Sequence, residues 1–509
     1  MVYVCADGLE FEIIDEIEAK AKELDNSRLL DVHRWSDHPE VDRFVSEIYD
    51  TFFRERKADI ARKHLKVLLL DLYVSWFDDP ERYTAIHRSP NAYFAGSRYN
   101  ELHISRKTIG VVDVLIEAGL LDYHKGFLDR GTGIGRLTRV RPAAPLIERF
   151  KGAVFSLFDI GDHDDRLLIE LRNDDANDVN ASKGGLVEYE PTDDTLRMGD
   201  VLQRYNALLR RTFVDVPILG AKADHADWFS TSQAYKTVRR IFNRGRFDCG
   251  GRFYGGWWQN CPKEWRSRIF INDGSTTEID FSGLHIVLLY ASKGISYWAE
   301  DHAQGPYDLG QLPPFETAEQ TRAAVKLLAL MALNAKSRGD AFSAFRSAAK
   351  PGSDEKRMTN DQLDHLLAAF EKRHPEIADQ LCSDAGIRLM ATDSKITDII
   401  IDRFTQRGVP VLSIHDSYIV PTGQEDLLVR TMHEAFEEVT GVRLGKTDQG
   451  TKEVSDRPGD MWDFLITNWQ PYEGYDLKRE GDEYRNRVDP ERTERYRHTL
   501  AAFNEWLNR

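Results

Sequence analysis

Two apolar stretches of the chain are each interrupted by polar residues at one place. In the first, Thr277–Ala291, Asp280 ends a β-compatible run, and of the ten residues that follow only Ser282 and His285 are clearly polar. This pattern predicts a carboxylate at the end of a strand, beside a buried helix or a second strand. Taken alone, a strand that ends in a capping aspartate is the simpler explanation.

The second stretch, VPVLSIHDSYIVP at 409–421, is broken by His415, Asp416 and Ser417 and then resumes. Two apolar segments around a polar triplet predict a β-hairpin with an acidic residue at its tip. If the fold brings Asp280 and Asp416 together, they can hold two divalent metal ions roughly 4 Å apart for in-line phosphoryl transfer. The ordered pair is better evidence than either aspartate.

A helical stretch, TAEQTRAAVKLLALMALNAKSRG, lies between the two aspartates. Arg322 and Lys326 are four residues apart and share one helical face, and Asn334 lies two turns further along it. We expect Arg322 and Lys326 to grip a triphosphate, with Lys326 protonating the departing pyrophosphate. On spacing alone, a solvated stripe on a core helix is the better explanation.

Helical periodicity marks the N-terminal part of the chain, as in Val41–Phe53 and Ile60–Trp76. Further along, Ser105 is placed to cap a helix that begins with Arg106 and Lys107. Gly119 is placed to end this helix.

Two strand-like pieces follow, Leu120–His124 and Arg136–Val140, on either side of a glycine-rich tip that contains Arg130. A helix followed by a two-stranded wing predicts a winged helix-turn-helix, with Arg106 and Lys107 facing DNA phosphates. The alternative is a small α+β subdomain whose charges are merely solvated.

The acidic, polar residues 172–199 predict an exposed linker and a domain boundary. The expected organisation is a helical region (1–95), a winged-helix-like domain (96–171), this linker, a catalytic region (200–470) and a C-terminal helical tail (471–509).

Composition limits the classes of protein. The formal net charge of −16 argues against indiscriminate polyanion binding, so a nucleic-acid site must be a local basic channel. The four cysteines show no CxxC pairing, which indicates neither a disulfide framework nor a structural zinc site. No apolar run reaches about 18 residues and the N-terminal segment is acidic, so we expect a cytoplasmic protein without membrane association.

A local reversal of charge supplies such a channel. Residues 236–268 interleave cations with aromatic rings, which suits phosphates and bases, and the glycines of GGRFYGGWW allow close backbone approach. The alternative is an amphipathic helix followed by an aromatic-rich core loop. The residues concerned are Lys236, Arg239, Arg240, Arg244, Arg246, Arg252, Lys263, Arg266 and Arg268 with Phe253, Tyr254, Trp257, Trp258 and Trp265.

Together these pieces resemble the palm and fingers of the single-subunit polymerase superfamily, which contains phage-type RNA polymerases and family A DNA polymerases. Asp280 and Asp416 resemble the two metal-binding motifs, and Arg322 with Lys326 the fingers-helix motif. DCGGRFY, with Asp248, Gly251 and Arg252, is similar to the DxxGR signature of the RNA polymerase branch. ATDSKITDIIIDRF matches the helix before the last motif. The likeness covers about residues 235–440.

The resemblance implies an α+β right-hand polymerase with palm, fingers and thumb, preceded by the N-terminal helical and winged-helix-like region. It implies two Mg²⁺ ions, replaceable by Mn²⁺, and as partners a nucleic-acid template, DNA by preference, and nucleoside triphosphates. The residues expected to bind nucleotide are Arg322, Lys326, Asn334, His285 and His415. Those expected to bind template are Asp248, Gly251, Arg252 and Tyr254, with Arg106 and Lys107 of the N-terminal region.

Departures from the family pattern affect sugar selection. His285 stands where DNA polymerases have Glu and RNA polymerases Gly, and Asn334 then Ala335 stand where both have Tyr then Gly. The absence of Glu favours ribonucleotides, while the size of His285 also suits a gate against them. The first hypothesis is a compact RNA polymerase or primase of a phage or mobile element. The alternatives are a family A-like DNA polymerase and a replication initiator whose palm is catalytically silent.

Overall fold

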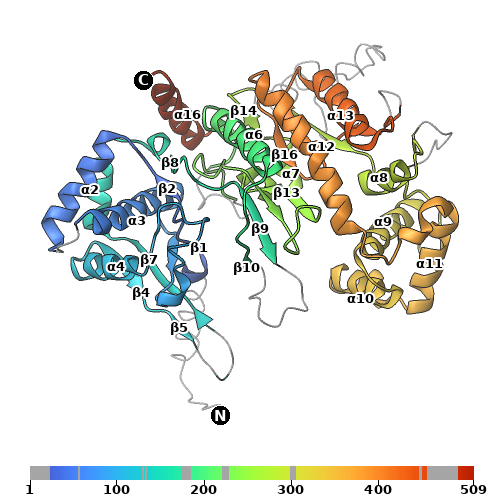
Figure 1. The fold of residues 1–509 in the computed structure, drawn as a ribbon, viewed down its shortest axis with the longest axis horizontal. Helices are drawn as coiled ribbons and strands as arrows, with labels where there is room; N and C mark the ends of the chain where they lie inside the picture. Colours follow the sequence, from blue (N-terminus) through green and yellow to red (C-terminus); the bar gives the residue numbers. More distant parts are fainter. Residues whose placement is uncertain are drawn as a thin grey trace, which may run out of the picture. The chain divides into compact units, whose positions relative to one another are not determined.

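The computed structural model describes residues 23–54, 58–128, 131, 135–173, 185–220, 229–298, 305–445, 450–454 and 491–509. They form two compact units, both of which mix helices with small sheets (Figure 1). Unit 1 contains the described residues up to Leu167 and those of Gly220–Tyr235 and Arg497–Arg509. Unit 2 contains those of Leu168–Leu219 and Lys236–Tyr496. Arg130 of the predicted wing lies outside the described residues.

A four-stranded sheet of order β1-β3-β7-β4 organises unit 1. Its strands are β1 (Ser27–Leu29), β3 (Tyr83–Ile86), β7 (Thr138–Pro142) and β4 (Leu121–His124). Strands β1 and β3 precede residue 95, whereas β4 and β7 follow it. Backbone hydrogen bonding across the sheet therefore joins the two domains that we predicted as 1–95 and 96–171 into one unit.

Helices supply most of the core of unit 1. The two helices predicted from periodicity are present as α2 (Pro39–Phe52) and α3 (Ala58–Asp78), and α5 (Ala144–Lys151) packs nearby. Side chains of α3 such as Leu65 and Leu72 are fully buried, which explains the apolar character of this segment. The C-terminal helix α16 (Glu494–Leu507) ends the chain.

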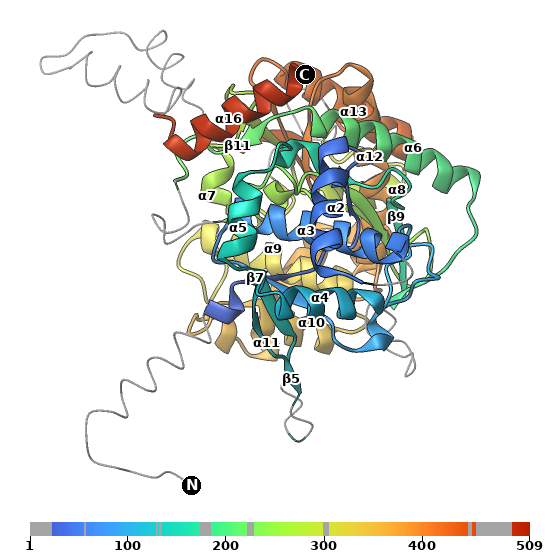
Figure 2. The same cartoon turned by 90° about the vertical axis from the view of Figure 1, so that its left-hand side faces the viewer.

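Helix α4 (Lys107–Glu117) begins after Ser105, whose Oγ accepts a hydrogen bond from the Lys107 backbone N–H at 3.3 Å. Its last residue is Glu117, its C-cap is Ala118, and Gly119 follows with a φ of +67° that favours glycine. Strand β4 then pairs antiparallel with β7, and a short hairpin of β5 (Phe127–Leu128) and β6 (Gly135–Arg136) lies between them in sequence. Figure 2 shows β5 extending away from α3 and α4.

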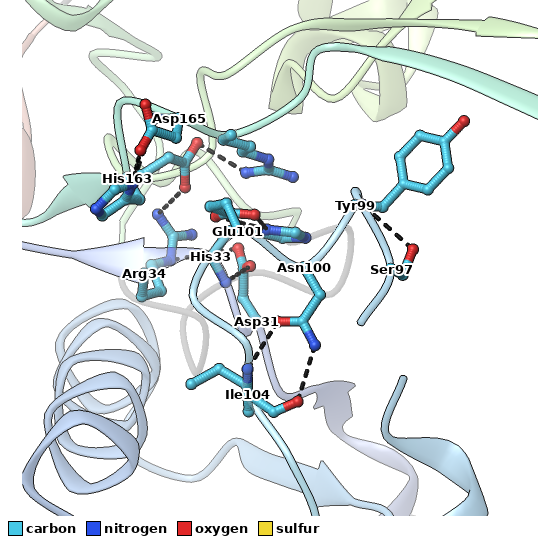
Figure 3. Close-up of polar contacts among 12 residues, drawn as sticks. Asp31, His33, Arg34, Ser97, Tyr99, Asn100, Glu101, Ile104, His163 and Asp165 are labelled. Carbon is cyan, nitrogen blue, oxygen red and sulfur yellow. Dashed lines mark hydrogen bonds and ion pairs between the residues drawn. The ribbon is translucent and has the colours of Figure 1, made fainter. Parts of the chain in front are cut away.

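The loop before α4 is held by side chains (Figure 3). The Asn100 amide accepts from the Ile104 backbone N–H and donates to the Ile104 carbonyl, both at 2.8 Å. His33, beside strand β2 (Arg34–Trp35), has its Nδ1 3.0 Å from both carboxylate oxygens of Glu101. These contacts fix the start of α4, where Arg106 and Lys107 are exposed.

Unit 2 contains a second four-stranded sheet, of order β16-β17-β15-β18. Its strands are β15 (Thr276–Phe281), β16 (Leu412–Ile414), β17 (Ser417–Pro421) and β18 (Thr451–Glu453). Helices α8 (Leu284–Ser292), α12 (Gly386–Gln406) and α13 (Glu425–Thr440) belong to the same unit. The apolar residues of β15, β16 and β17 are mostly buried, as expected for a sheet covered by helices.

Three helices of unit 2 gather beside α8 (Figure 1): α9 (Ala318–Asn334), α10 (Arg338–Ala348) and α11 (Asn360–Arg373). Another sheet has the order β10-β9-β12-β13, with β10 (Gly185–Leu186), β9 (Ile169–Asn173), β12 (Arg239–Phe242) and β13 (Gly250–Tyr254). Two further strands, β11 (Val214–Asp215) and β14 (Phe270–Ile271), pair with each other. None of the described helices is long and apolar enough to cross a membrane.

The predicted linker at 172–199 is only partly without regular structure. Helix α6 (Asp193–Arg210) begins inside it, because Thr192 and Thr195 form a reciprocal cap and Asp193 and Asp194 follow at the helix start. Acidic residues that resemble a linker are therefore also the first turn of a helix. Residues 174–184 of this segment lie outside the described residues.

Candidate active site

The antiparallel pairing of β15 with β17 brings Asp280 and Asp416 side by side. Asp280 is the register partner of Ser417, and the backbone N–H of Phe281 donates to the Asp416 carbonyl at 3.2 Å. Pairing of Ile414 with Ser417 leaves a two-residue turn, His415–Asp416, as the hairpin tip. His415 has a φ of +58°, the conformation that such tight turns require. The predicted hairpin is therefore present.

The surroundings of Asp280 disfavour its ionised form. Burial, followed by the negative charge of Asp416, raises the pKa of Asp280 to about 7. The positive charges of Lys452 and Lys326 act in the opposite direction. Lys452 is the register partner of Asp280 on β18, so the two side chains lie on the same face of the sheet. Sequence analysis missed Lys452, because its three-residue strand shows no periodicity.

Helix α9 carries the other predicted cations. A reciprocal cap between Thr317 and Gln320 starts the helix. Arg322 forms an ion pair with Asp308, with Nε 2.7 Å from Oδ1. Lys326 is exposed and acts on Asp280 through its charge. Asn334 is the last residue of α9, and its side chain contacts the start of α12.

The Asn334 amide packs against Gly386 at the start of α12, where a Cβ would lie 2.1 Å from Asn334 Oδ1. Its Nδ2 donates to the Leu330 carbonyl at 2.8 Å. These contacts place the Asn334 side chain against the end of its own helix and the start of α12. The nucleotide-binding role of Asn334 stays a prediction.

Arg252 connects three elements next to the aspartate pair. From β13, its Nε and Nη2 lie 2.9 and 2.7 Å from Oδ2 of Asp393 on α12, and Nη2 is 3.1 Å from Nε2 of His285 on α8. The Arg252 side chain is 15 % exposed and that of Asp393 1 %. Asp393 lies within ATDSKITDIIIDRF, but nothing in that pattern distinguished it from the other polar residues of the helix.

His285 is held neutral in this network. Burial, followed by the charge of Arg252, lowers the pKa of His285 to about 4. Because a guanidinium only donates hydrogen bonds, His285 Nε2 is the acceptor and Nδ1 carries the proton. Burial and Arg252 also lower the pKa of His415. Both imidazoles are therefore uncharged near pH 7.

The predicted basic and aromatic groove is wrong for several of its members, which are buried. Lys236 donates to the Thr212 carbonyl at 2.7 Å, and Arg240 pairs with Asp398 at 3.1 Å. Trp258 is fully buried and donates from Nε1 to the Ser413 carbonyl. Partners distant in sequence thus satisfy these side chains inside unit 2. Phe253, Trp257 and Trp258 are buried, as expected for an aromatic-rich core loop. The amphipathic helix of that alternative is wrong, because Arg239–Phe242 form strand β12.

The remaining predicted template residues have varied surroundings. Asp248 is exposed, and a hydrogen bond from Arg246 lowers the pKa of its carboxyl to about 2. Gly251 has a φ of +78°, and a Cβ there would lie 2.5 Å from the Phe242 ring, so packing alone accounts for the glycine. Tyr254 is 37 % exposed, with its ring centroid 6.2 Å from that of His415. Tyr254 is therefore in ring contact with His415 at the hairpin tip.

Among the described residues, Asp280 and Asp416 are the carboxylates that would hold a metal ion at this site. Within the described ranges there is no group of three or more His, Cys, Asp or Glu residues suited to a metal ion. Two carboxylates still fit Mg²⁺, which keeps several waters and takes its other ligands from substrate phosphates. The mutual repulsion that raises the pKa of Asp280 is also what a divalent cation relieves.

Comparison with known proteins identifies no family for this chain. No family model and no curated protein matches the chain. A solved structure, the POL domain of Pol1 from M. smegmatis in complex with DNA primer-template and dNTP, is similar at 11 % identity and a TM-score of 0.31. The similarity covers 51 % of this chain and 50 % of the Pol1 chain, so the chain spans about half the length of that structure.

Proposed function

We propose that unit 2 is a template-directed nucleotidyltransferase whose active site is built on Asp280, Asp416 and Lys326. The observation that carries the proposal is the pairing of β15 with β17, which sets the two aspartates side by side. Lys326, on a separate helix, contributes positive charge to the same site. Paired carboxylates facing a cation suit a nucleoside triphosphate that binds together with divalent metal ions.

Asp280 and Asp416 are the residues that would hold Mg²⁺, or Mn²⁺ in its place. When bound, the metal supplies positive charge that activates an attacking 3′ hydroxyl and stabilises the phosphoryl group. Asp280 must release its proton before it coordinates a cation. Because its pKa is about 7, metal affinity increases as the pH rises through neutrality.

The two cations of α9 have different roles in this proposal. Lys326 is exposed and donates a proton to the departing pyrophosphate. Arg322 binds the triphosphate through its guanidinium, a geometry that suits phosphate oxygens. The spacing of one helical turn lets both residues reach one polyphosphate.

Ribonucleotides are the proposed substrates, with DNA as the template. His285 bears no negative charge and its Nε2 is engaged by Arg252, which leaves Nδ1–H as the donor for a sugar hydroxyl. The second candidate is a family A-like DNA polymerase. The observation that favours it is the hydrogen bond from Arg252 Nη2 to His285 Nε2 at 3.1 Å, which orients the imidazole as a steric gate against the 2′ hydroxyl requires.

Unit 1 is proposed as a winged-helix-type element that grips duplex DNA. Its support is the order β3, α4, β4, hairpin, β7, with the sheet arranged β3-β7-β4. Arg106 and Lys107 are exposed at the start of α4, where basic side chains and the helix N-terminus both favour phosphates. Such an element increases the affinity for template without taking part in the chemistry.

Incubation of the protein with primed or unprimed DNA, Mg²⁺ and either rNTPs or dNTPs tests this function. We expect extension with rNTPs, and a kcat/KM for one rNTP that exceeds that of its dNTP on the same template. A strong dNTP preference that His285→Gly relaxes would establish the DNA polymerase alternative. Duplex binding without extension under any of these conditions would favour a replication initiator with a silent palm.

A further inference from the structure

A four-residue turn, Gly305–Asp308, is fastened close to Asp280. The Asp308 backbone N–H donates to the Gly305 carbonyl at 3.1 Å, and the Gly305 N–H donates to Asp308 Oδ2 at 2.9 Å. Pro306 is buried against Gly283, where a Cβ would lie 2.4 Å from Pro306 Cγ. Gly283 begins helix α8 three residues after Asp280, so the turn packs against the segment that carries the first aspartate.

The turn has a second anchor on another element. His374, at the end of α11, donates from Nε2 to the Pro306 carbonyl at 2.7 Å. Tyr307 is 8 % exposed, and its ring stacks on Phe370 with centroids 6.4 Å apart. Burial, followed by the negative charge of Asp416, raises the pKa of the Tyr307 phenol. The turn therefore lies within electrostatic reach of the aspartate pair.

Asp308 is the residue of this turn that meets the predicted triphosphate-binding cation. Its Oδ1 lies 2.7 Å from Nε of Arg322, while Oδ2 is occupied by the Gly305 N–H. The two side chains are 36 % and 44 % exposed, so an incoming anion can reach the pair. Arg322 is thus already neutralised by a carboxylate that the backbone holds in a fixed orientation.

We propose that the Asp308 carboxylate competes with the nucleoside triphosphate for the Arg322 guanidinium. This inference rests on the proposed function, and it adds the step by which the site admits its substrate. The triphosphate replaces one carboxylate on Arg322, so the guanidinium is never left without an anionic partner. Anions with less charge, such as a nucleoside monophosphate, displace Asp308 less readily, which gives the pair a role in selecting triphosphates.

The substitution Asp308→Asn tests this competition. Asparagine retains an oxygen for the Gly305 N–H but removes the charge that holds Arg322. The KM for the nucleotide should decrease by about twofold to fivefold, as expected for an exposed ion pair, with little effect on kcat. Asp308→Glu should keep KM near the wild-type value. Asp364→Asn, which alters the similarly exposed Arg338–Asp364 pair, is the matched control and should leave KM unchanged.

A double-mutant cycle shows whether Asp308 acts through Arg322. In an Arg322→Gln background, Asp308→Asn should no longer decrease KM. An unchanged KM in the single variant, or an equal decrease in both backgrounds, would overturn the inference. Equilibrium binding of ATP and AMP with Mg²⁺, without template, separates this from the proposed function. Tighter ATP binding by Asp308→Asn in a protein that extends no primer would retain the competition and reject the polymerase, whereas unchanged ATP binding would reject the competition.

Discussion

At the level of single residues, the ionised carboxyl of Asp280 lowers the free energy of unfolding. Its pKa of about 7, against an ordinary value of 3.8, means that the folded protein binds this proton more tightly than the unfolded chain does. Without metal, Asp280 therefore destabilises the fold progressively as the pH rises from about 4 to about 7. The proposed metal-binding role accounts for a carboxylate at this buried position.

Asp280→Asn should consequently increase the free energy of unfolding while removing activity. The gain should reach at most about 4 kcal/mol at pH 8 and be smaller at pH 5, because the wild-type carboxyl is already protonated in the fold there. Urea unfolding of both proteins at the two pH values, in the presence of a chelator, measures this difference. A destabilised variant at pH 8 would show that Asp280 is ionised and well paired in the folded protein.

At the scale of elements, Arg252 joins β13, α8 and α12 around a buried carboxylate. Arg252→Ala leaves Asp393 without its partner and should cost roughly 3 kcal/mol in the free energy of unfolding at pH 8. The cost should be smaller at pH 5, where Asp393, with a pKa of about 6, is already protonated. Chemical denaturation at both pH values checks this. A stable variant whose template binding depends less on salt would instead identify Arg252 as a phosphate contact.

The sequence predicted elements well where the signal was local. Strand β15, the hairpin of β16 and β17, and helices α3, α4 and α9 follow from periodicity, caps and turn residues that lie within each segment. The interior of unit 2 was not predictable in this way. Arg240 resembled a groove cation because its partner, Asp398, is 158 positions away in the chain, and single-sequence patterns do not report such pairing.

In the candidate site, too, residues with a local sequence signal were predicted and residues placed by long-range contacts were not. The order of Asp280, Lys326 and Asp416 indicated chemistry before any geometry was known. Lys452 and Asp308 carried no signal, because one stands in a three-residue strand and the other in an irregular turn. Their positions next to Asp280 and Arg322 depend on strand register and on packing, which are properties of the folded chain.

For the whole molecule, the proposed function assigns nucleotidyl transfer to unit 2 and DNA binding to unit 1. Unit 2 carries every residue assigned to nucleotidyl transfer, and unit 1 carries the exposed cations at the start of α4. Because the net charge is −16, the proposed binding of nucleic acid depends on such local sites. The domain boundary expected at residue 95 does not appear, since one sheet spans it.

Asp280 and Asp416 are proposed to act together in metal-dependent nucleotidyl transfer, which single-turnover extension of a primed DNA template tests. Asp416→Asn should decrease the rate by about a thousandfold with no loss of thermal stability, while the control Asp384→Asn, which alters an Arg–Asp pair elsewhere in unit 2, should extend at the wild-type rate. Extension by Asp416→Asn at the wild-type rate would contradict the account.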